Sequence, residues 1–363
     1  MSLINQIAKI AVDHKASDIH LKVDSPPILR INGELNPLDL PDLSRQDIEA
    51  IINSVLPNHS KIMFAETNEA DFSVDIEDIG RFRVNMFVGK GKPTIAMRHV
   101  KNEIPTFQTL NLPEEINRIA TLRRGIVLLA GTTGSGKSST IAAILNQINK
   151  TRYSRIITIE DPVEYNFHDE KSIITQREVG IDTNTFHSAL KALMRQDPDI
   201  IFIGEMRDPV SINAALLAAE TGHLVFSTIH ASTADAAISR MMDVFPSNEQ
   251  SSVRLAIAAT MNTIVCQRLV PANLPVGVVP AVEIMINSPI VKKNIVLNNL
   301  TTLSTAIATG RKDGMLTFDQ SMYQLIKKGW ISEADGMKYA TSPESLKMNL
   351  QGIFLDNQNR IFK

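Results

Sequence analysis

The stretch Gly125-Ile-Val-Leu-Leu-Ala-Gly-Thr-Thr-Gly-Ser-Gly-Lys-Ser-Ser139 decides the fold of this chain. Its apolar run, residues 126–130, is typical of a buried strand, and a glycine-rich turn follows directly. The turn has the spacing Gly131-x4-Gly136-Lys137-Ser138, the full pattern of a phosphate-binding loop between a strand and a helix. Glycines let backbone N–H groups approach phosphate oxygens, and the following helix directs its positive end at them. We therefore predict a nucleotide-binding site here.

The side chains of this loop have separable tasks. Lys137 is expected to reach the β and γ phosphates of ATP, and Ser138 to ligate Mg²⁺. ATP and Mg²⁺ are therefore the predicted cofactors. The residues expected to contact the nucleotide are Gly131, Thr132, Thr133, Gly134, Ser135, Gly136, Lys137, Ser138 and Ser139.

Composition narrows the class of protein. A length of 363 residues favours two domains, and a hydrophobic share of 44% is that of an ordinary globular protein. The net charge of −2 and the aromatic share of 5% argue against broad nucleic-acid binding, so nucleic acid is not an expected partner. The single cysteine, Cys266, suits a reducing cytoplasm. The polar N-terminus does not resemble a signal peptide, and no membrane span is expected.

We expect four regions along the chain. They are a small α+β domain at 1–101, a linker at 102–113, a larger α/β domain at 114–290 and a helical region at 291–363. In the first domain, Ser44 and Asp47 are expected to cap a helix over 43–56. Alternating patterns predict strands there at 28–33, 70–75, 81–87 and 95–99.

The larger domain alternates short apolar runs with helical patterns. The expected strands are 126–130, 155–159, 200–203 and 224–227, and the expected helices are 137–149, 185–195, 209–220 and 233–243. This alternation predicts a largely parallel sheet flanked by helices, in which ligands bind beyond the carboxyl ends of the strands.

Two glutamates follow expected strands. Glu205 comes just after the run 200–203, where a carboxylate can orient or deprotonate an attacking water or hold Mg²⁺ through its hydration shell. A surface acid that closes a strand is the alternative. Glu160 ends another strand and is favoured for the metal and water network. Asp161 and Glu164 could equally be solvated or capping residues.

Two histidines flank the expected strand 224–227. His230 is predicted to act near phosphate, where an imidazole can hydrogen-bond the γ-phosphate or titrate near neutral pH, while His223 could be functional or structural. Zinc is disfavoured because the pair lies across a strand rather than on one helix face. Arg195 could contact phosphate or pair with nearby aspartates.

Four motifs, at 131–139, 157–165, 197–208 and 221–230, resemble in order the Walker A, Asp box, Walker B and His box of the type II/IV secretion ATPase superfamily. Segments 16–21, 30–33 and 80–85 are similar to the N-terminal domain of the PilT group, the pilus retraction motors. The resemblance covers roughly residues 1–330. It implies a PAS-like N-terminal domain, a RecA-like ATPase domain and a homohexamer. It also implies Glu205 as the catalytic glutamate, Glu160 in the metal network and His230 near the γ-phosphate.

The resemblance also implies a function and partners. We expect a motor ATPase that couples ATP hydrolysis to type IV pilus retraction, placed in the cytoplasm at the cytoplasmic face of the inner membrane. Its expected partners are an inner-membrane platform protein of the pilus and other pilus motor ATPases.

The subgroup stays open. A chain with only Cys266 cannot build the four-cysteine zinc insert usual in extension and secretion ATPases. The chain is also short, so we do not expect the extra N-terminal domain typical of extension motors, and retraction is favoured. Retraction motors often carry Ala-Ile-Arg-Asn-Leu-Ile-Arg-Glu, however, where residues 289–298 read Pro-Ile-Val-Lys-Lys-Asn-Ile-Val-Leu-Asn. A PilU-like accessory retraction ATPase and an extension or secretion ATPase remain alternatives, and a nucleic-acid translocase is the alternative from another class.

Three arginines of the first domain have two possible roles. Arg81 and Arg83 project from one face of a strand, and Arg98 follows on the next strand. They could be solvated or paired with acidic residues of a facing strand (Asp71, Asp75 and Glu77). The resemblance favours the second role, in which they reach the nucleotide of a neighbouring subunit as arginine fingers.

Overall fold

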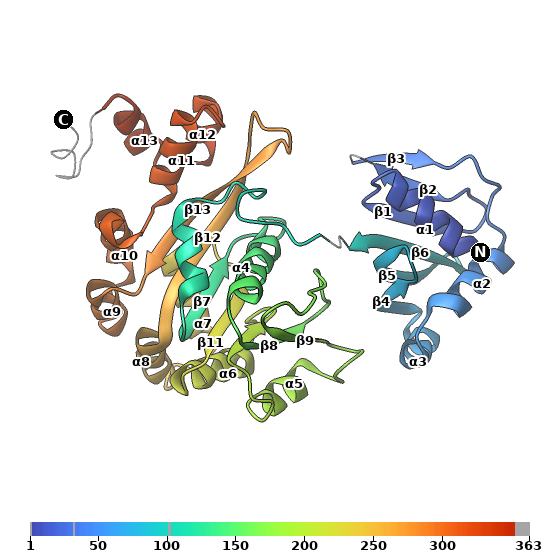
Figure 1. Cartoon of the computed structure of the whole chain (residues 1–363), viewed down its shortest axis with the longest axis horizontal. Helices are drawn as coiled ribbons and strands as arrows, with labels where there is room; N and C mark the ends of the chain where they lie inside the picture. Colours follow the sequence, from blue (N-terminus) through green and yellow to red (C-terminus); the bar gives the residue numbers. More distant parts are fainter. Residues whose placement is uncertain (1, 32, 101–102, 353–363) are drawn as a thin grey trace. The chain divides into compact units, whose positions relative to one another are not determined.

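The computed structural model describes residues 2–31, 33–100 and 103–352, and the chain folds into two compact units (Figure 1). The first unit holds Met1–Ile104 with two short segments, Asp161–Asn166 and Arg177–Thr185. The second holds Pro105–Glu160, Phe167–Gln176 and Phe186–Lys363. Position 32 of the strand expected at 28–33, position 102 of the expected linker and 353–363 of the helical region lie outside the described residues.

The N-terminal unit is built on a six-stranded antiparallel sheet in the order β3-β2-β1-β6-β5-β4. Its strands are β1 (Asp18–Lys22), β2 (Ile28–Ile31), β3 (Glu34–Pro37), β4 (Glu69–Ile76), β5 (Gly80–Gly89) and β6 (Lys92–Val100). Its helices are α1 (Leu3–Asp13), α2 (Arg45–Val55) and α3 (Asn58–Thr67). One apolar core joins α1 and α2 to the sheet through residues such as Ile7, Ile48 and Phe82.

The predicted helix start in this unit is confirmed. The Ser44 hydroxyl accepts a hydrogen bond from the Asp47 N–H, and the Asp47 carboxylate accepts one from the Ser44 N–H. These reciprocal bonds satisfy two backbone donors that the first turn of a helix leaves unpaired. They fix the residue at which α2 begins, and hence which of its side chains pack into the core.

The second unit is built on a seven-stranded sheet in the order β13-β12-β7-β11-β10-β8-β9. The strands are β7 (Gly125–Ala130), β8 (Arg155–Glu160), β9 (Ile173–Glu178), β10 (Ile200–Ile203), β11 (Leu224–Ile229), β12 (Met261–Pro271) and β13 (Val278–Ile286). The five strands from β12 to β8 in this order are parallel, and β13 is antiparallel to β12. The predicted parallel sheet is thus confirmed, with β7 near its centre.

Helices follow most of these strands. They are α4 (Lys137–Thr151), α5 (Phe186–Leu193), α6 (Pro209–Glu220), α7 (Ala234–Asp243) and α8 (Gln250–Thr260). The α4 helix packs its apolar residues, including Ile141, Ile144 and Ile148, into a core shared with the sheet. A short η1 helix (Glu114–Thr121) precedes β7 and contributes Ile116 and Ile119 to the same core.

The end of the chain is helical, as expected, over its described part. After β13 come α9 (Pro289–Val296), η2 (Leu300–Thr302), α10 (Leu303–Thr309), η3 (Arg311–Asp313), α11 (Phe318–Lys327), α12 (Glu333–Tyr339) and α13 (Pro343–Leu350). The Ser321 hydroxyl of α11 accepts a hydrogen bond from the Val282 N–H. Arg268 of β12 lies 3.8 Å from the centre of the Phe318 ring and donates to the Tyr339 carbonyl. These contacts fasten the final helices to the sheet. Among the described residues, the helices are too short or too polar to span a bilayer.

Candidate nucleotide site

The phosphate-binding loop joins the fully buried strand β7 to helix α4 at the carboxyl edge of the parallel strands. Gly134 and Gly136 have left-handed φ angles of 77° and 86°, which glycine adopts at little cost. A Cβ added at Gly131 would lie 2.4 Å from the Ser135 hydroxyl and 2.7 Å from the Gln267 carbonyl oxygen. The loop therefore needs glycine at these positions to keep its shape.

The groups inside the loop fit the phosphates of a nucleotide. Lys137 is buried, and its ammonium donates hydrogen bonds of 2.9 Å to the carbonyls of Gly131 and Thr132. Ser135 is only 3% exposed, and its hydroxyl is buried with no hydrogen-bond partner within the described part of the chain. Burying an unpaired hydroxyl is costly, and an anion among backbone N–H groups would accept from it. Thr132, Thr133 and Gly134 are exposed in the loop, while Ser138 and Ser139 lie in the first turn of α4.

Glu160 ends β8 at the same edge of the sheet. It is 6% exposed, and one of its carboxylate oxygens accepts hydrogen bonds from the Thr158 hydroxyl at 2.7 Å and from the Gln176 amide at 3.1 Å. Because two neutral groups donate to the same oxygen, the orientation of the Glu160 carboxylate is fixed. Of the acids that follow, Asp161 and Glu164 are both exposed.

The structure brings Glu205 and His230 together. Glu205 follows β10, and His230 follows β11, the adjacent parallel strand. The His230 Nε2 atom lies 3.3 Å from one Glu205 oxygen, and Arg207 donates to the other from Nε at 2.8 Å and Nη2 at 2.7 Å. A Cβ at Gly204 would lie 3.1 Å from the Ile159 carbonyl, so glycine lets the chain before Glu205 pass close to β8.

One edge of the sheet therefore carries all four motifs. The neighbouring parallel strands β7, β11, β10 and β8 deliver, at their carboxyl ends, the phosphate loop, His230, Glu205 and Glu160 respectively. Anion-binding N–H groups, a lysine and two carboxylates on one edge are the parts that phosphoanhydride hydrolysis requires.

His223 and Arg195, whose roles the sequence left open, lie at the opposite edge of the sheet, where the parallel strands begin. His223 precedes the amino end of β11, and its Nδ1 lies 2.9 Å from the Ala218 carbonyl and 3.0 Å from the Thr221 hydroxyl. The six residues of β11 separate it from His230, and its hydrogen bonds go to the end of α6 and the turn that follows. Arg195 precedes the amino end of β10, away from the phosphate loop. Asp199 accepts a hydrogen bond from the Arg155 N–H at 2.8 Å.

The three arginines of the N-terminal unit differ in their surroundings. Arg81 is 16% exposed and pairs with Asp75 at 3.5 Å and Glu178 at 2.5 Å. The pairing with Asp75 is one that the sequence left open. Arg83 is exposed, and Arg98, 70% exposed, pairs with Asp18 at 2.8 Å.

The pKa of Asp18 reflects its hydrogen-bond donors, Ser17 and Arg98. Burial raises the pKa of Asp18, but hydrogen bonds from Ser17 and Arg98 outweigh it and hold that pKa below its ordinary value. Whether any of these arginines reaches a neighbouring subunit stays a prediction.

Two buried polar residues that contact predicted site residues were not themselves predicted from the sequence. Glu178, 3% exposed, accepts from Arg81 and also from the Val163 N–H at 3.1 Å. Gln267 of β12 is 3% exposed and donates to the Ser135 carbonyl at 2.7 Å. The only signal for Gln267 was an amide side chain, followed by Arg268, between the apolar residues 264–266 and 269–270.

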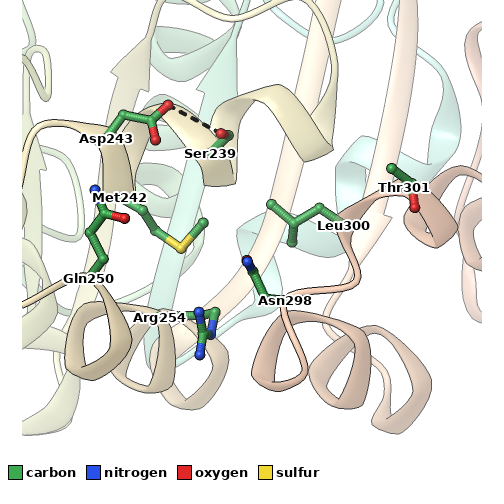
Figure 2. A pocket seen from close by; sticks show the side chains of 8 residues that line it. All are labelled: Ser239, Met242, Asp243, Gln250, Arg254, Asn298, Leu300 and Thr301. Atoms are coloured by element: carbon green, nitrogen blue, oxygen red, sulfur yellow. Dashed lines mark hydrogen bonds between the residues drawn. The ribbon is translucent and has the colours of Figure 1, made fainter. Parts of the chain in front are cut away.

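A cavity of about 260 Å³ lies elsewhere in the second unit (Figure 2). Its lining comes from α7, α8 and the segment after α9, and comprises Ser239, Met242, Asp243, Gln250, Arg254, Asn298, Leu300 and Thr301. Ser239 donates to Asp243 across its rim at 3.2 Å. No residue predicted for the nucleotide site lines this cavity.

The parallel sheet, the phosphate loop at the end of β7 and the carboxylates on the same edge of the sheet define a P-loop ATPase. The family model described as type II/IV secretion system protein matches residues 1–288, and the chain belongs to that family. The resemblance found in the sequence is thereby confirmed.

Relatives match along nearly the whole chain. The chain is 38% identical to the type IV pilus retraction ATPase PilT of Pseudomonas aeruginosa over 94% of its own length and 99% of that protein. It is 34% identical to the type IV pilus ATPase PilU of the same organism, over 95% of this chain and 91% of PilU. A crystal structure of the pilus retraction motor PilT with bound ADP aligns with a TM-score of 0.88 at 40% identity, covering 96% of this chain and 99% of the other.

Proposed function

We propose that this chain is a motor ATPase that uses ATP hydrolysis to retract type IV pili. The observation that carries the proposal is the 38% identity to the P. aeruginosa retraction ATPase, which spans both units and 99% of that protein. The phosphate loop and the carboxylates at the carboxyl edge of the sheet supply the chemistry for such an enzyme. The solved relative contains bound ADP, which supports nucleotide binding by this chain.

The residues at that edge divide the reaction between them. The backbone of 131–139 and the Lys137 ammonium hold the phosphates, because both present positive charge to the oxygens. Ser138 and Glu160 would hold Mg²⁺, directly or through water, and the ion would supply positive charge to offset that of the phosphates. Glu205 orients the attacking water and accepts its proton. His230, in contact with Glu205, responds to the γ-phosphate.

The assembly is proposed as a homohexameric ring. Arg81, Arg83 and Arg98 of one subunit would neutralise charge at the nucleotide of its neighbour. We propose 1–101 as a PAS-like domain, 102–113 as a linker, 114–290 as the ATPase domain and 291–363 as a helical extension. The ring would work at the cytoplasmic face of the inner membrane, with the platform protein of the pilus and other pilus motor ATPases as partners.

A PilU-like accessory role is the second candidate. It is favoured by the 34% identity to PilU across 95% of the chain. It is also favoured by residues 289–298, where this chain departs from the sequence common in retraction motors. An accessory ATPase would add force to a retraction motor but would not retract pili alone.

Deletion of the gene tests the proposal. A retraction motor is expected to leave a strain that carries excess pili and does not twitch, because pili assemble but are not withdrawn. A strain without pili would contradict retraction and indicate an extension motor. Expression of this chain as the sole retraction ATPase separates the two candidates, since only a self-sufficient motor restores twitching.

A further inference from the structure

Gln267 lies behind the phosphate loop, on the strand next to β7. The parallel register pairs Cys266 with Ala130, which places Gln267 beside Gly131, the first residue of the loop. We propose that Gln267 is a positioning residue of the nucleotide site, which holds the loop in its phosphate-binding shape. The inference rests on the proposed role of residues 131–139 as the phosphate site.

Two hydrogen bonds fix the orientation of the Gln267 amide. The Thr140 hydroxyl, in the first turn of α4, donates to Gln267 Oε1 at 2.8 Å. Gln267 Nε2 in turn donates to the Ser135 carbonyl at 2.7 Å. Because the hydroxyl donates to the amide oxygen, the amide nitrogen faces the loop.

The bond to Ser135 sets the direction of the next backbone donor. A trans peptide points its C=O and N–H groups to opposite sides. With the Ser135 carbonyl held toward β12, the Gly136 N–H points away from β12. Gln267 thus turns a loop donor toward the side on which a phosphate can approach.

Steric contacts tie the same residue to both loop glycines. A Cβ at Gly136 would lie 2.7 Å from Gln267 Nε2, and one at Gly131 would lie 2.7 Å from the Gln267 carbonyl oxygen. Side chains at either position would displace Gln267 or the loop. The two glycines of the motif are therefore required by Gln267 as well as by the phosphates.

The test compares nucleotide affinity in full-length variants, with a fluorescent ADP analogue as the probe. Gln267→Met removes both hydrogen bonds at nearly constant volume, and we expect the Kd to rise about tenfold. Asn149→Leu is the matched control. Asn149 is 1% exposed, lies at the far end of α4 and makes two similar hydrogen bonds, to the His168 carbonyl and from the Glu170 N–H. It should lose stability but keep its Kd.

A second variant separates positioning from packing. Gln267→Glu places an acceptor against the Ser135 carbonyl, so its Kd should rise more than about tenfold when the carboxylate is ionised. Lowering the pH protonates that carboxyl and restores a donor. The Kd relative to wild type should therefore recover as pH falls, and the Gln267→Met variant should show no such recovery.

Several outcomes would overturn the inference. It fails if Gln267→Met binds the probe within about twofold of wild type while Lys137→Ala loses binding, or if Asn149→Leu weakens binding equally. If Lys137→Ala binds normally, the proposed phosphate site itself is wrong. If Gln267→Met does not fold, two other variants decide between the outcomes. The Kd of Gln267→Glu relative to wild type should recover as pH falls, and the Kd of Thr140→Val should rise about threefold or more. A flat profile together with an unchanged Thr140→Val refutes the proposal.

Discussion

The Glu205 carboxylate is held from both sides. Arg207 engages one oxygen and His230 contacts the other, so the carboxylate has little freedom to rotate. Its side chain is 19% exposed, which leaves it accessible to water. A fixed, accessible carboxylate on the same edge of the sheet as the phosphate loop suits the orientation of an attacking water.

Glu205→Gln should separate binding from hydrolysis. The amide keeps the size of the side chain but cannot accept a proton, so we expect kcat to fall by about 10² or more while nucleotide affinity stays near wild type. Steady-state ATPase assays and a binding titration measure the two quantities. Glu220→Gln, an exposed glutamate at the end of α6, is the control. Near-normal hydrolysis by Glu205→Gln would move the water-orienting role to Glu160.

Single site residues could be predicted where they belong to a short motif or directly follow a strand pattern. The loop residues, Glu160, Glu205 and His230 all fall within short motifs or directly after apolar runs, and the structure places them on one edge. Gln267 and Glu178 could not be found this way. Their partners Ser135 and Arg81 lie 132 and 97 residues away in sequence.

At the scale of helices and strands, the spacing of apolar residues along the sequence predicted the elements around the site. The strand expected at 200–203 and the helix expected at 209–220 have the bounds of β10 and α6. In the second unit, η1, β9, α8, β12 and β13 were not predicted, and in the first unit β1, β3 and α3 were not. The α8 helix ends at Thr260 and β12 begins at Met261, with no turn residue between them. The apolar residues of this stretch therefore follow neither the spacing of a helix nor that of a strand throughout. In β13, Pro280 and Glu283 interrupt the apolar run, and they lie opposite Leu269 and Cys266 of β12.

Glu283 predicts a pH dependence at the contact of β13 with α7. Its carboxylate accepts the Ala234 N–H at 2.9 Å, at the start of the helix that follows His230. Burial raises the pKa of Glu283, the Ala234 hydrogen bond lowers it, and the nearby Asp235 raises it further, with a net rise above the ordinary value. A raised folded-state pKa contributes stability at low pH, which is lost as pH rises through that pKa.

Glu283→Gln removes this titration and keeps an acceptor for Ala234. The urea midpoint of wild type minus that of the variant should therefore decrease as pH rises from about 4.5 upward. Urea denaturation over a pH series measures the difference, with Glu220→Gln as a control that should stay flat. A difference that is constant or grows with pH would show that Glu283 is not held with a raised pKa.

For the whole molecule, the ring and its arginines are the central structural proposal. Arg81 is engaged within the N-terminal unit by Glu178, so its removal would disturb that pair. Arg83 and Arg98 are exposed and are the cleaner candidates for contact with a neighbouring subunit. Sequence could identify these three residues but not their surroundings, because Glu178 and Asp18 come from distant segments.

Mixed rings test the role of these arginines in trans. We expect Arg83→Ala/Arg98→Ala and Glu205→Gln each to be nearly inactive, because one lacks charge neutralisation and the other lacks the water-orienting carboxylate. Mixing them should restore part of the ATPase activity at interfaces that have both parts intact. Arg45→Ala, an exposed arginine of α2, is the control, and light scattering should give about six times the 40.1 kDa subunit mass. Full activity of the double arginine variant would make these residues ordinary surface charges.

Imaging of labelled pili in living cells tests the account most directly. A deletion strain that expresses the wild-type chain should extend and withdraw its pili. The same strain with Glu205→Gln should extend pili and leave them extended, because nucleotide binds but hydrolysis does not drive withdrawal. Withdrawal at the wild-type rate by Glu205→Gln, or loss of pilus extension in the deletion strain, would contradict an ATP-driven retraction motor.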